Sequence, residues 1–226
     1  TVFPEYSFWL NVTDKPTNVI FGEEVRLLKG PGFYDCQDGG LTYEVGPRTF
    51  VQVNENVRGK LYDRALSFAD EGDTVIDCYA GGGLLTAKFA KKCRKAYGIE
   101  IVPEAHDCAE KLKTDNALGE RMENLCGKVE DLLAGVLERE PDALVVLDPP
   151  RAGVARGVLE LLIRKNVGRI VMISCDPATL ARDVGILTGA LIEKDGALVK
   201  AEVPAGPYSV TCVEPFDMFP QTKHVE

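Results

Sequence analysis

The chain has 226 residues, of which 45% are hydrophobic and 27% charged, and it contains 22 glycines and 13 prolines. This composition is typical of a globular protein and excludes disordered, collagen-like and membrane-embedded chains. The 26 basic and 35 acidic residues give a net charge of −9, which argues against a protein that coats nucleic acid.

The first 49 residues carry short strand-like stretches. Residues 19–21, 25–28 and 41–45 are rich in apolar and β-branched side chains, and glycine and proline separate them at residues 30–32 and 39–40. We therefore expect two or three antiparallel strands in a small β-rich segment, residues 1–49. The remaining residues, 50–226, follow a different pattern and form the second predicted domain.

A helical pattern begins at about residue 57, where Val57, Leu61, Ala65 and Phe68 fall on one face. Strand and helix signals then alternate. We predict strands at residues 74–77, 96–99, 144–148 and 169–174, and helices at residues 84–92, 103–116, 154–165 and 177–187. Strands that are apolar throughout, each followed by a helix, indicate a doubly wound, mostly parallel α/β sheet of the Rossmann-like type. Such sheets collect ligands at the carboxyl ends of their strands.

The cysteines and the lack of a long apolar run bear on the compartment. The chain contains seven cysteines without a C-x-x-C pair, a pattern that indicates a reducing compartment and no metal cage. It has no run of roughly 18 apolar residues and no signal-peptide pattern at its start. We therefore expect a cytoplasmic protein with no metal and no membrane association.

A glycine-rich turn follows the first strand of the alternating region. It runs from Asp77 to Gly83, and its glycines, Gly81 and Gly83 among them, let the backbone approach a ligand closely. Glu100 ends the next strand, where an acid can accept both ribose hydroxyls of an adenosine. Because Thr86 stands where a dinucleotide site has its third glycine, the pattern favours S-adenosylmethionine over NAD. A tight connection without a ligand is the alternative.

Two further strand ends carry chemistry. Cys175 lies between a strand and a helix that starts with Pro177, so its side chain enters the crevice near helix N–H groups that favour the thiolate. This is the position of a nucleophile, although a lone cysteine is also often simply buried. Asp148 ends another strand and is followed by two prolines; its carboxylate can bind the edge of a planar base or cap a helix.

The combination of motifs resembles the RNA uracil-5 methyltransferases, which include enzymes of 23S ribosomal RNA and of the tRNA T-loop. The resemblance covers about residues 41–226. It is carried by F-x-Q-x-N at residues 50–54, the glycine turn at 77–83, D-P-P-R at 148–151, S-C-D-P-A-T-L-A-R-D at 174–183 and D-M-F-P-Q-T-K-H-V-E at 217–226.

The resemblance implies a catalytic site. Cys175 is then the nucleophile that adds to C6 of the uracil, and Glu226 is the base that removes the C5 proton. The cofactor, S-adenosylmethionine, and the target base are expected at Gln52, Tyr79, Glu100 and Asp148, with Gly81 and Gly83 also at the cofactor and with Asp148 and Gln52 facing the base.

Two departures from the family pattern stand out. Leu84 replaces an asparagine that many relatives carry after the glycine turn, which removes a polar contact to the methionine end of the cofactor. Residues 191–207 look longer than usual, and we expect an extra strand at 198–203.

The resemblance also implies an RNA partner. Relatives commonly carry an N-terminal oligonucleotide-binding barrel, which is not visible here, so we interpret this chain as the catalytic portion of a longer enzyme and residues 1–49 as the remnant of a central domain. The basic cluster at residues 88–95 is interpreted as a solvated helix face rather than an RNA track. Methyltransferases of this class usually end with a strand that inserts beside residues 169–174; if the chain stops at Glu226, another segment or chain must fill that slot.

Several alternatives remain open. We favour 23S ribosomal RNA as substrate over the tRNA T-loop. RNA cytosine-5 methyltransferases use the same thiolate addition but typically have a cysteine after Asp-Pro-Pro, where this chain has Arg151. A catalytically inactive cofactor- or RNA-binding module and a nicotinamide oxidoreductase are the remaining candidates.

Overall fold

The structure is a computed structural model that describes residues 6–13, 22, 24–52, 54–222 and 225. A five-stranded parallel sheet of order β7-β6-β5-β8-β9 forms its centre. Its strands are β5 (Thr74–Cys78), β6 (Lys95–Glu100), β7 (Met122–Cys126), β8 (Leu144–Leu147) and β9 (Arg169–Met172). The order reverses between β5 and β8, which places a crevice at the carboxyl ends of these strands. The predicted doubly wound α/β fold is confirmed.

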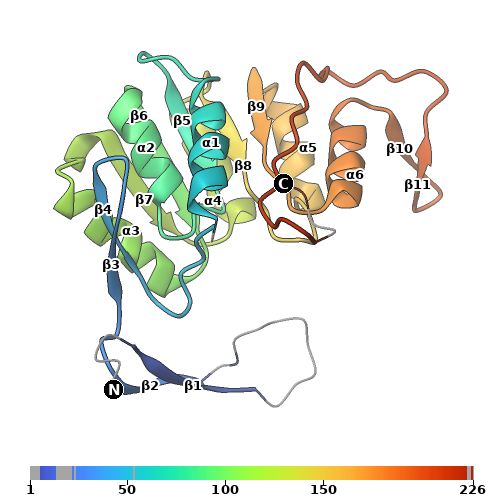
Figure 1. Cartoon of the computed structure of the whole chain (residues 1–226). Coiled ribbons are helices and arrows are strands. Elements are labelled where there is room, and N and C mark those ends of the chain that lie inside the picture. The colour runs from blue at the N-terminus through green and yellow to red at the C-terminus, as the bar shows by residue number, and fades with distance from the viewer. Residues whose placement is uncertain (1–5, 14–21, 23, 53, 223–224, 226) are drawn as a thin grey trace.

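In the described part of the chain, six α-helices cover the two faces of the sheet (Figure 1). They are α1 (Glu55–Leu66), α2 (Leu84–Lys92), α3 (Pro103–Asp115), α4 (Val129–Arg139), α5 (Arg156–Lys165) and α6 (Pro177–Leu187). Residues of α1, α2 and α3 share one core with Val75 and Val146. Residues of α4, α5 and the end of α6 share the other core with Ile76 and Val145. Successive strand residues thus point to opposite faces, as the uninterrupted apolar strands required.

Among the residues described before the central sheet, the strands form two antiparallel hairpins. The first pairs β1 (Phe8–Val12) with β2 (Glu24–Lys29), and the second pairs β3 (Tyr34–Asp38) with β4 (Leu41–Val45). Figure 1 shows the β1–β2 hairpin projecting away from the central sheet. The strands predicted near residues 25–28 and 41–45 are present, whereas residues 19–21 lie outside the described residues.

The β3–β4 hairpin is attached to the helical layer. Leu41 is 1% exposed and belongs to the core of α1, α2 and α3. The side chain of Asn116, just after α3, donates to the Thr42 carbonyl (2.7 Å) and accepts from the Thr42 N–H (2.9 Å). At the same turn end of the hairpin, Oδ2 of Asp38 accepts from Nη2 of Arg58 in α1 at 2.8 Å. The hairpin is therefore part of the same packed body as the sheet.

After α6 the chain forms a separate hairpin of β10 (Leu191–Lys194) and β11 (Ala197–Lys200). The expected extra strand is therefore present but ends earlier than predicted, at Lys200. It pairs with β10 and not with the central sheet, so it does not fill the slot beside β9. Among the described residues, β9 has a single neighbouring strand, β8.

Candidate active site

The glycine turn after β5 has a left-handed backbone. Gly81 and Gly83 have φ values of +54° and +79°, which side chains other than glycine rarely adopt. A Cβ at Gly83 would lie 2.7 Å from the Cβ of Ala109 in α3, so this position has no room for a side chain. These two constraints explain why the turn needs glycine, and they bring the start of α2 close to α3.

Glu100 holds the turn from the neighbouring strand. Its Oε2 accepts from the Gly81 N–H (2.8 Å) and its Oε1 accepts from the Val102 N–H (2.7 Å). Each carboxylate oxygen can accept more than one hydrogen bond, so acceptor capacity remains for a ligand. The acid predicted 19 residues after Gly81 therefore lies directly at the turn.

Asp77 lies beneath the turn and was not among the predicted site residues. It is 1% exposed, and its Oδ2 accepts from the Thr86 hydroxyl at 2.6 Å. Burial raises the pKa of Asp77 to about 7, and the charge of Glu100 adds to this rise. Thr86, which broke the dinucleotide pattern, is thus the hydrogen-bond partner of a buried acid.

The side chain of Tyr79 points away from the glycine turn. Its backbone is left-handed, with φ +66°, and its ring packs against the core of α4 and α5. It lines a cavity of about 440 Å³ together with Pro150, Val154 and Leu159. Burial raises its pKa to about 12. The main chain of Tyr79, rather than its side chain, therefore lies beside the glycine turn.

Cys175 lies in the turn between β9 and α6 and is partly exposed. The turn is held by Asp176, whose Oδ1 accepts from the N–H groups of Ala178 (2.9 Å) and Thr179 (3.0 Å) and so caps α6. These backbone hydrogen bonds lower the pKa of Asp176, and the charge of Arg151 adds to the effect. The Cys175 turn and the Asp-Pro-Pro-Arg segment are therefore neighbours.

Asp148 follows β8 at the same edge of the sheet. Its N–H donates to the Cys78 carbonyl at 3.3 Å, and the N–H of Ile173, just after β9, donates to the Leu147 carbonyl at 2.8 Å. Burial raises the pKa of Tyr62 in α1, and the nearby negative charge of Asp148 raises it further. Asp148 thus lies between the Cys175 turn and α1.

The F-x-Q-x-N segment leads into α1. Gln52 is 3% exposed, and its main-chain carbonyl accepts a hydrogen bond from Nη1 of Arg58 at 3.0 Å. Asn54 caps α1 by accepting from the Val57 N–H (3.3 Å), and its Nδ2 donates to the Met218 carbonyl (3.3 Å). Two motifs 164 residues apart in the sequence therefore meet.

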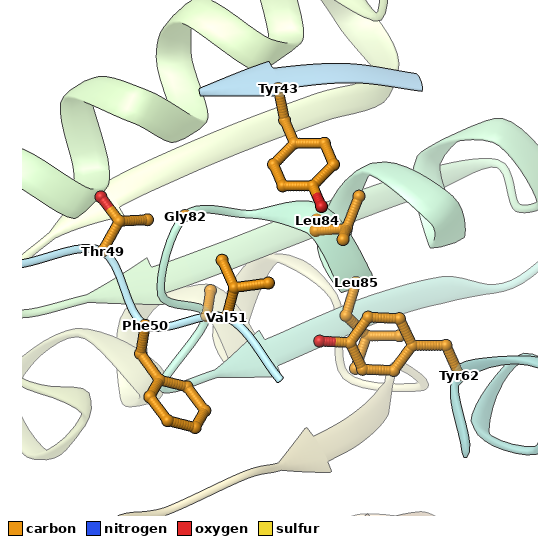
Figure 2. A pocket seen from close by; sticks show the side chains of 9 residues that line it. Tyr43, Thr49, Phe50, Val51, Tyr62, Gly82, Leu84 and Leu85 are labelled. Atoms are coloured by element: carbon orange, nitrogen blue, oxygen red, sulfur yellow. The ribbon is translucent and has the colours of Figure 1, made fainter. Parts of the chain in front are cut away.

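A small cavity adjoins the glycine turn and the F-x-Q-x-N segment (Figure 2). It measures about 20 Å³, which is room for about one water molecule. Thr49, Phe50 and Val51 lie along one side of it, and Gly82 and Leu84 lie on the other. Leu84 is 6% exposed and presents only an apolar side chain there, as expected from its replacement of a polar residue.

The basic side chains of residues 88–95 form ion pairs and hydrogen bonds within the chain. Lys88 pairs with Asp38, Arg94 with Glu140 and Lys95 with Glu123. Lys91 and Lys92 donate to the carbonyls of Gly40 and Leu66. Lys88, Lys91 and Lys92 lie on α2, but Arg94 follows it and Lys95 begins β6, and the Lys88 side chain is only 13% exposed. The cluster is therefore not a single solvated helix face as interpreted.

The structure thus brings most predicted site residues to one edge of the sheet. The glycine turn, Asp148 and Cys175 follow three of the strands there, and Glu100 ends a fourth. Gln52 lies in the segment before α1. Glu226 lies outside the described residues. In the part of the chain that the structure describes, no group of acidic, cysteine and histidine side chains could hold a metal ion, and no helix is long and apolar enough to cross a membrane.

Two family models match parts of the chain: tRNA (uracil-5-)-methyltransferase at residues 130–199 and RNA cap guanine-N2 methyltransferase at residues 72–157. Among curated proteins, an RNA methyltransferase of Oceanobacillus iheyensis is 38% identical over 99% of this chain and 46% of its own length. One from Clostridium tetani is 35% identical over 96% of this chain and 44% of its own. The chain therefore spans about half the length of the curated relatives it matches.

A solved structure agrees with these matches. The tRNA (uracil-54, C5)-methyltransferase of Pyrococcus abyssi, in complex with S-adenosyl-L-homocysteine, superposes with a TM-score of 0.71 at 25% identity, over 97% of this chain and 49% of that one. The five-stranded sheet, with its glycine turn after β5 and its acid at the end of β6, is the fold of a Rossmann-like methyltransferase. Within that class, the chain belongs to the RNA uracil-5 methyltransferase family.

Proposed function

We propose that this chain is the catalytic part of an S-adenosylmethionine-dependent RNA uracil-5 methyltransferase. The observation that carries the proposal is the shared edge of the sheet, at which the glycine turn with Glu100 lies on one side and the Cys175 turn with Asp148 on the other. The glycine turn and Glu100 support binding of a nucleoside cofactor. The Cys175 turn and Asp148 support chemistry on a planar base.

The residues at the turn fit S-adenosylmethionine. Glu100 is fixed by two N–H groups and can accept hydrogen bonds from the ribose hydroxyls, while Gly81 and Gly83 leave backbone uncovered by a Cβ. Gln52 and Asp148 flank the same crevice. Leu84 offers the methionine end no polar contact. When bound, the cofactor supplies an electrophilic methyl group on its sulfonium.

Cys175 carries the covalent step. Its thiolate forms a bond to C6 of the uracil, which makes C5 nucleophilic enough to take the methyl group. Glu226 then accepts the C5 proton, the electron pair of that C–H bond restores the C5–C6 double bond, and the C6–S bond breaks to release the thiolate. Asp148 and Gln52 hold the edge of the base during these steps.

The proposed substrate is RNA, with 23S ribosomal RNA favoured over the tRNA T-loop from the overall likeness of the motifs. The tRNA enzyme of Pyrococcus abyssi supports the alternative. In either case the target base must leave its stack to reach Cys175, at a cost of roughly a few kcal/mol. We further propose that an RNA-binding barrel belongs to the longer protein, and that the enzyme acts in the cytoplasm.

The experiment compares Cys175→Ala with Cys126→Ala, which alters an exposed cysteine at the end of β7. We expect Cys175→Ala to abolish transfer of labelled methyl groups to RNA, because the thiolate acts on the base. Binding of S-adenosylmethionine should stay within about a factor of ten, since the thiol does not contact the cofactor. Cys126→Ala should keep its activity. Undiminished transfer by Cys175→Ala would eliminate the proposed mechanism.

A further inference from the structure

Two adjacent residues of α6, Arg182 and Asp183, reach back to the loop that follows Asp148. Asp183 is 1% exposed, and its Oδ2 accepts from the Val154 N–H at 2.7 Å. Its Oδ1 accepts from Nε of Arg182 at 2.7 Å. Nη2 of Arg182 donates in turn to the Ala152 carbonyl at 2.9 Å. The main chain on both sides of Gly153 is therefore held by one pair of side chains.

Gly153 shows how closely the loop is fitted to this pair. Its φ is +79°, and a Cβ there would lie 2.4 Å from Nη2 of Arg182 and 2.5 Å from Oδ2 of Asp183. Its N–H donates to the Pro150 carbonyl at 2.8 Å, which closes the turn. The loop can adopt this path only with glycine at this position. The buried carboxylate of Asp183 is compensated by Arg182 and by the Val154 N–H, as a buried charge requires.

The same helix carries the Cys175 turn at its other end. Asp176 caps α6 immediately after Cys175, and Arg182 and Asp183 lie between that cap and the last turn of the helix. A helix is rigid over this length, so contacts made by Asp183 fix the loop after Asp148 relative to Cys175. Covalent addition to a base requires the thiol and the groups that hold the base in a defined geometry. A misplacement of about 1 Å can cost about a hundredfold in rate.

We infer that Arg182 and Asp183 are positioning residues, which hold the loop that follows Asp148 in register with the Cys175 turn. This inference rests on the proposed function. It assigns to the A-R-D end of the S-C-D-P-A-T-L-A-R-D motif a role separate from that of its cysteine.

The test uses the full chain with three variants. Asp183→Asn keeps an acceptor for the Val154 N–H but loses the charge that holds Arg182, whereas Asp183→Ala loses both. Arg182→Met keeps an apolar stem and loses the guanidinium. Arg164→Met, an exposed arginine of α5, is the matched control.

The first readout is the rate at which transcribed 23S ribosomal RNA and tRNA containing 5-fluorouridine form a covalent adduct, measured per folded molecule well below the unfolding midpoint. We expect Arg182→Met and Asp183→Asn to slow adduct formation about 10- to 100-fold, with Asp183→Ala slower still. Affinity for S-adenosylmethionine should change less than about twofold, because the glycine turn is held by Glu100. A purely structural role would lower the folded fraction and leave the rate per folded molecule unchanged, which would overturn the inference.

The second readout is hydrogen exchange of the amides in residues 148–156, which requires no reaction. These amides should exchange faster in Asp183→Ala and Arg182→Met than in the unaltered chain or in Arg164→Met. Unchanged exchange would overturn the inference. If the unaltered chain forms no adduct with either RNA, the proposed function fails, and the exchange data still decide whether this pair holds the loop.

Discussion

Asp77→Asn should remove a pH dependence of folding that the buried acid creates. Asp77 is 1% exposed, and burial raises its pKa from 3.8 to about 7. The unfolded chain therefore loses this proton above pH 4, while the folded chain keeps it to about pH 7. In that window the unfolded state binds fewer protons, so the free energy of unfolding falls as pH rises. The contribution is fully present below pH 4.

The size of the effect follows from the shift in pKa. A shift of about three units, at 1.36 kcal/mol per unit, corresponds to roughly 4 kcal/mol over the whole window. Between pH 5 and pH 8 the loss amounts to about 2 to 3 kcal/mol. An asparagine at this position has nearly the same shape, and its Oδ1 can still accept from the Thr86 hydroxyl, which lies 2.6 Å from the present carboxylate oxygen. The variant has no proton to lose.

The assay is urea unfolding followed by circular dichroism at pH 5 and pH 8. The unaltered chain should lose about 2 to 3 kcal/mol more stability between these pH values than Asp77→Asn does. The control is Asp195→Asn, at an exposed left-handed turn position, which should follow the unaltered chain. Carboxylates with lowered pKa, such as Asp38 and Glu140, lose their contribution only below about pH 5, so they do not affect the comparison. Parallel pH profiles for the chain and Asp77→Asn would refute the reasoning.

Three further predictions concern the site. Glu100→Ala should weaken binding of S-adenosylmethionine by roughly 1 to 3 kcal/mol, because it leaves the ribose hydroxyls and the N–H groups of Gly81 and Val102 without an acceptor. Calorimetry on the unaltered chain should detect no binding of NAD. Binding of NAD in preference to S-adenosylmethionine would contradict the interpretation of the glycine turn. Glu226→Gln should accumulate a covalent protein–RNA adduct on denaturing gels, since addition and methylation can proceed but proton removal stalls; lost turnover with no shifted band would count against Glu226 as the base. Adding a strand that pairs with the edge of β9, whose single neighbour among the described strands is β8, should speed RNA methylation, because a paired edge holds the adjoining Cys175 turn more firmly. Equal rates in matched assays would show that such a strand is dispensable.

The elements with strong apolar patterns could be predicted from the sequence. The helix predicted at residues 84–92 has those bounds as α2, and the helix predicted at 103–116 ends one residue earlier as α3. In contrast, β7 was not predicted, because Glu123 and Asn124 interrupt its apolar residues and only Met122 is buried. The helix α4 was also missed. It has no side-chain cap, although Val129, Leu133, Val136 and Leu137 are spaced for one helical face.

That most candidate site residues lie at one edge of the sheet could be predicted as well, because strand ends are visible in a sequence. The contacts that hold these residues in place could not be predicted from the sequence. The hydrogen bonds between Asn54 and Met218, and between Val154 and Asp183, join residues far apart along the chain and depend on how helices pack. The side-chain direction of Tyr79 depends on its left-handed backbone, which the pattern does not reveal.

The central claim, methylation at C5 of uracil, is tested most directly by the fate of the C5 hydrogen. RNA transcribed with uridine that carries tritium at C5 is incubated with the protein and with S-adenosylmethionine labelled in its methyl group. Tritium should be released into water in a one-to-one ratio with methyl transfer, and none should be released when Cys175→Ala replaces the unaltered chain. Methyl transfer without tritium release, or release only from RNA labelled at C5 of cytidine, would contradict it.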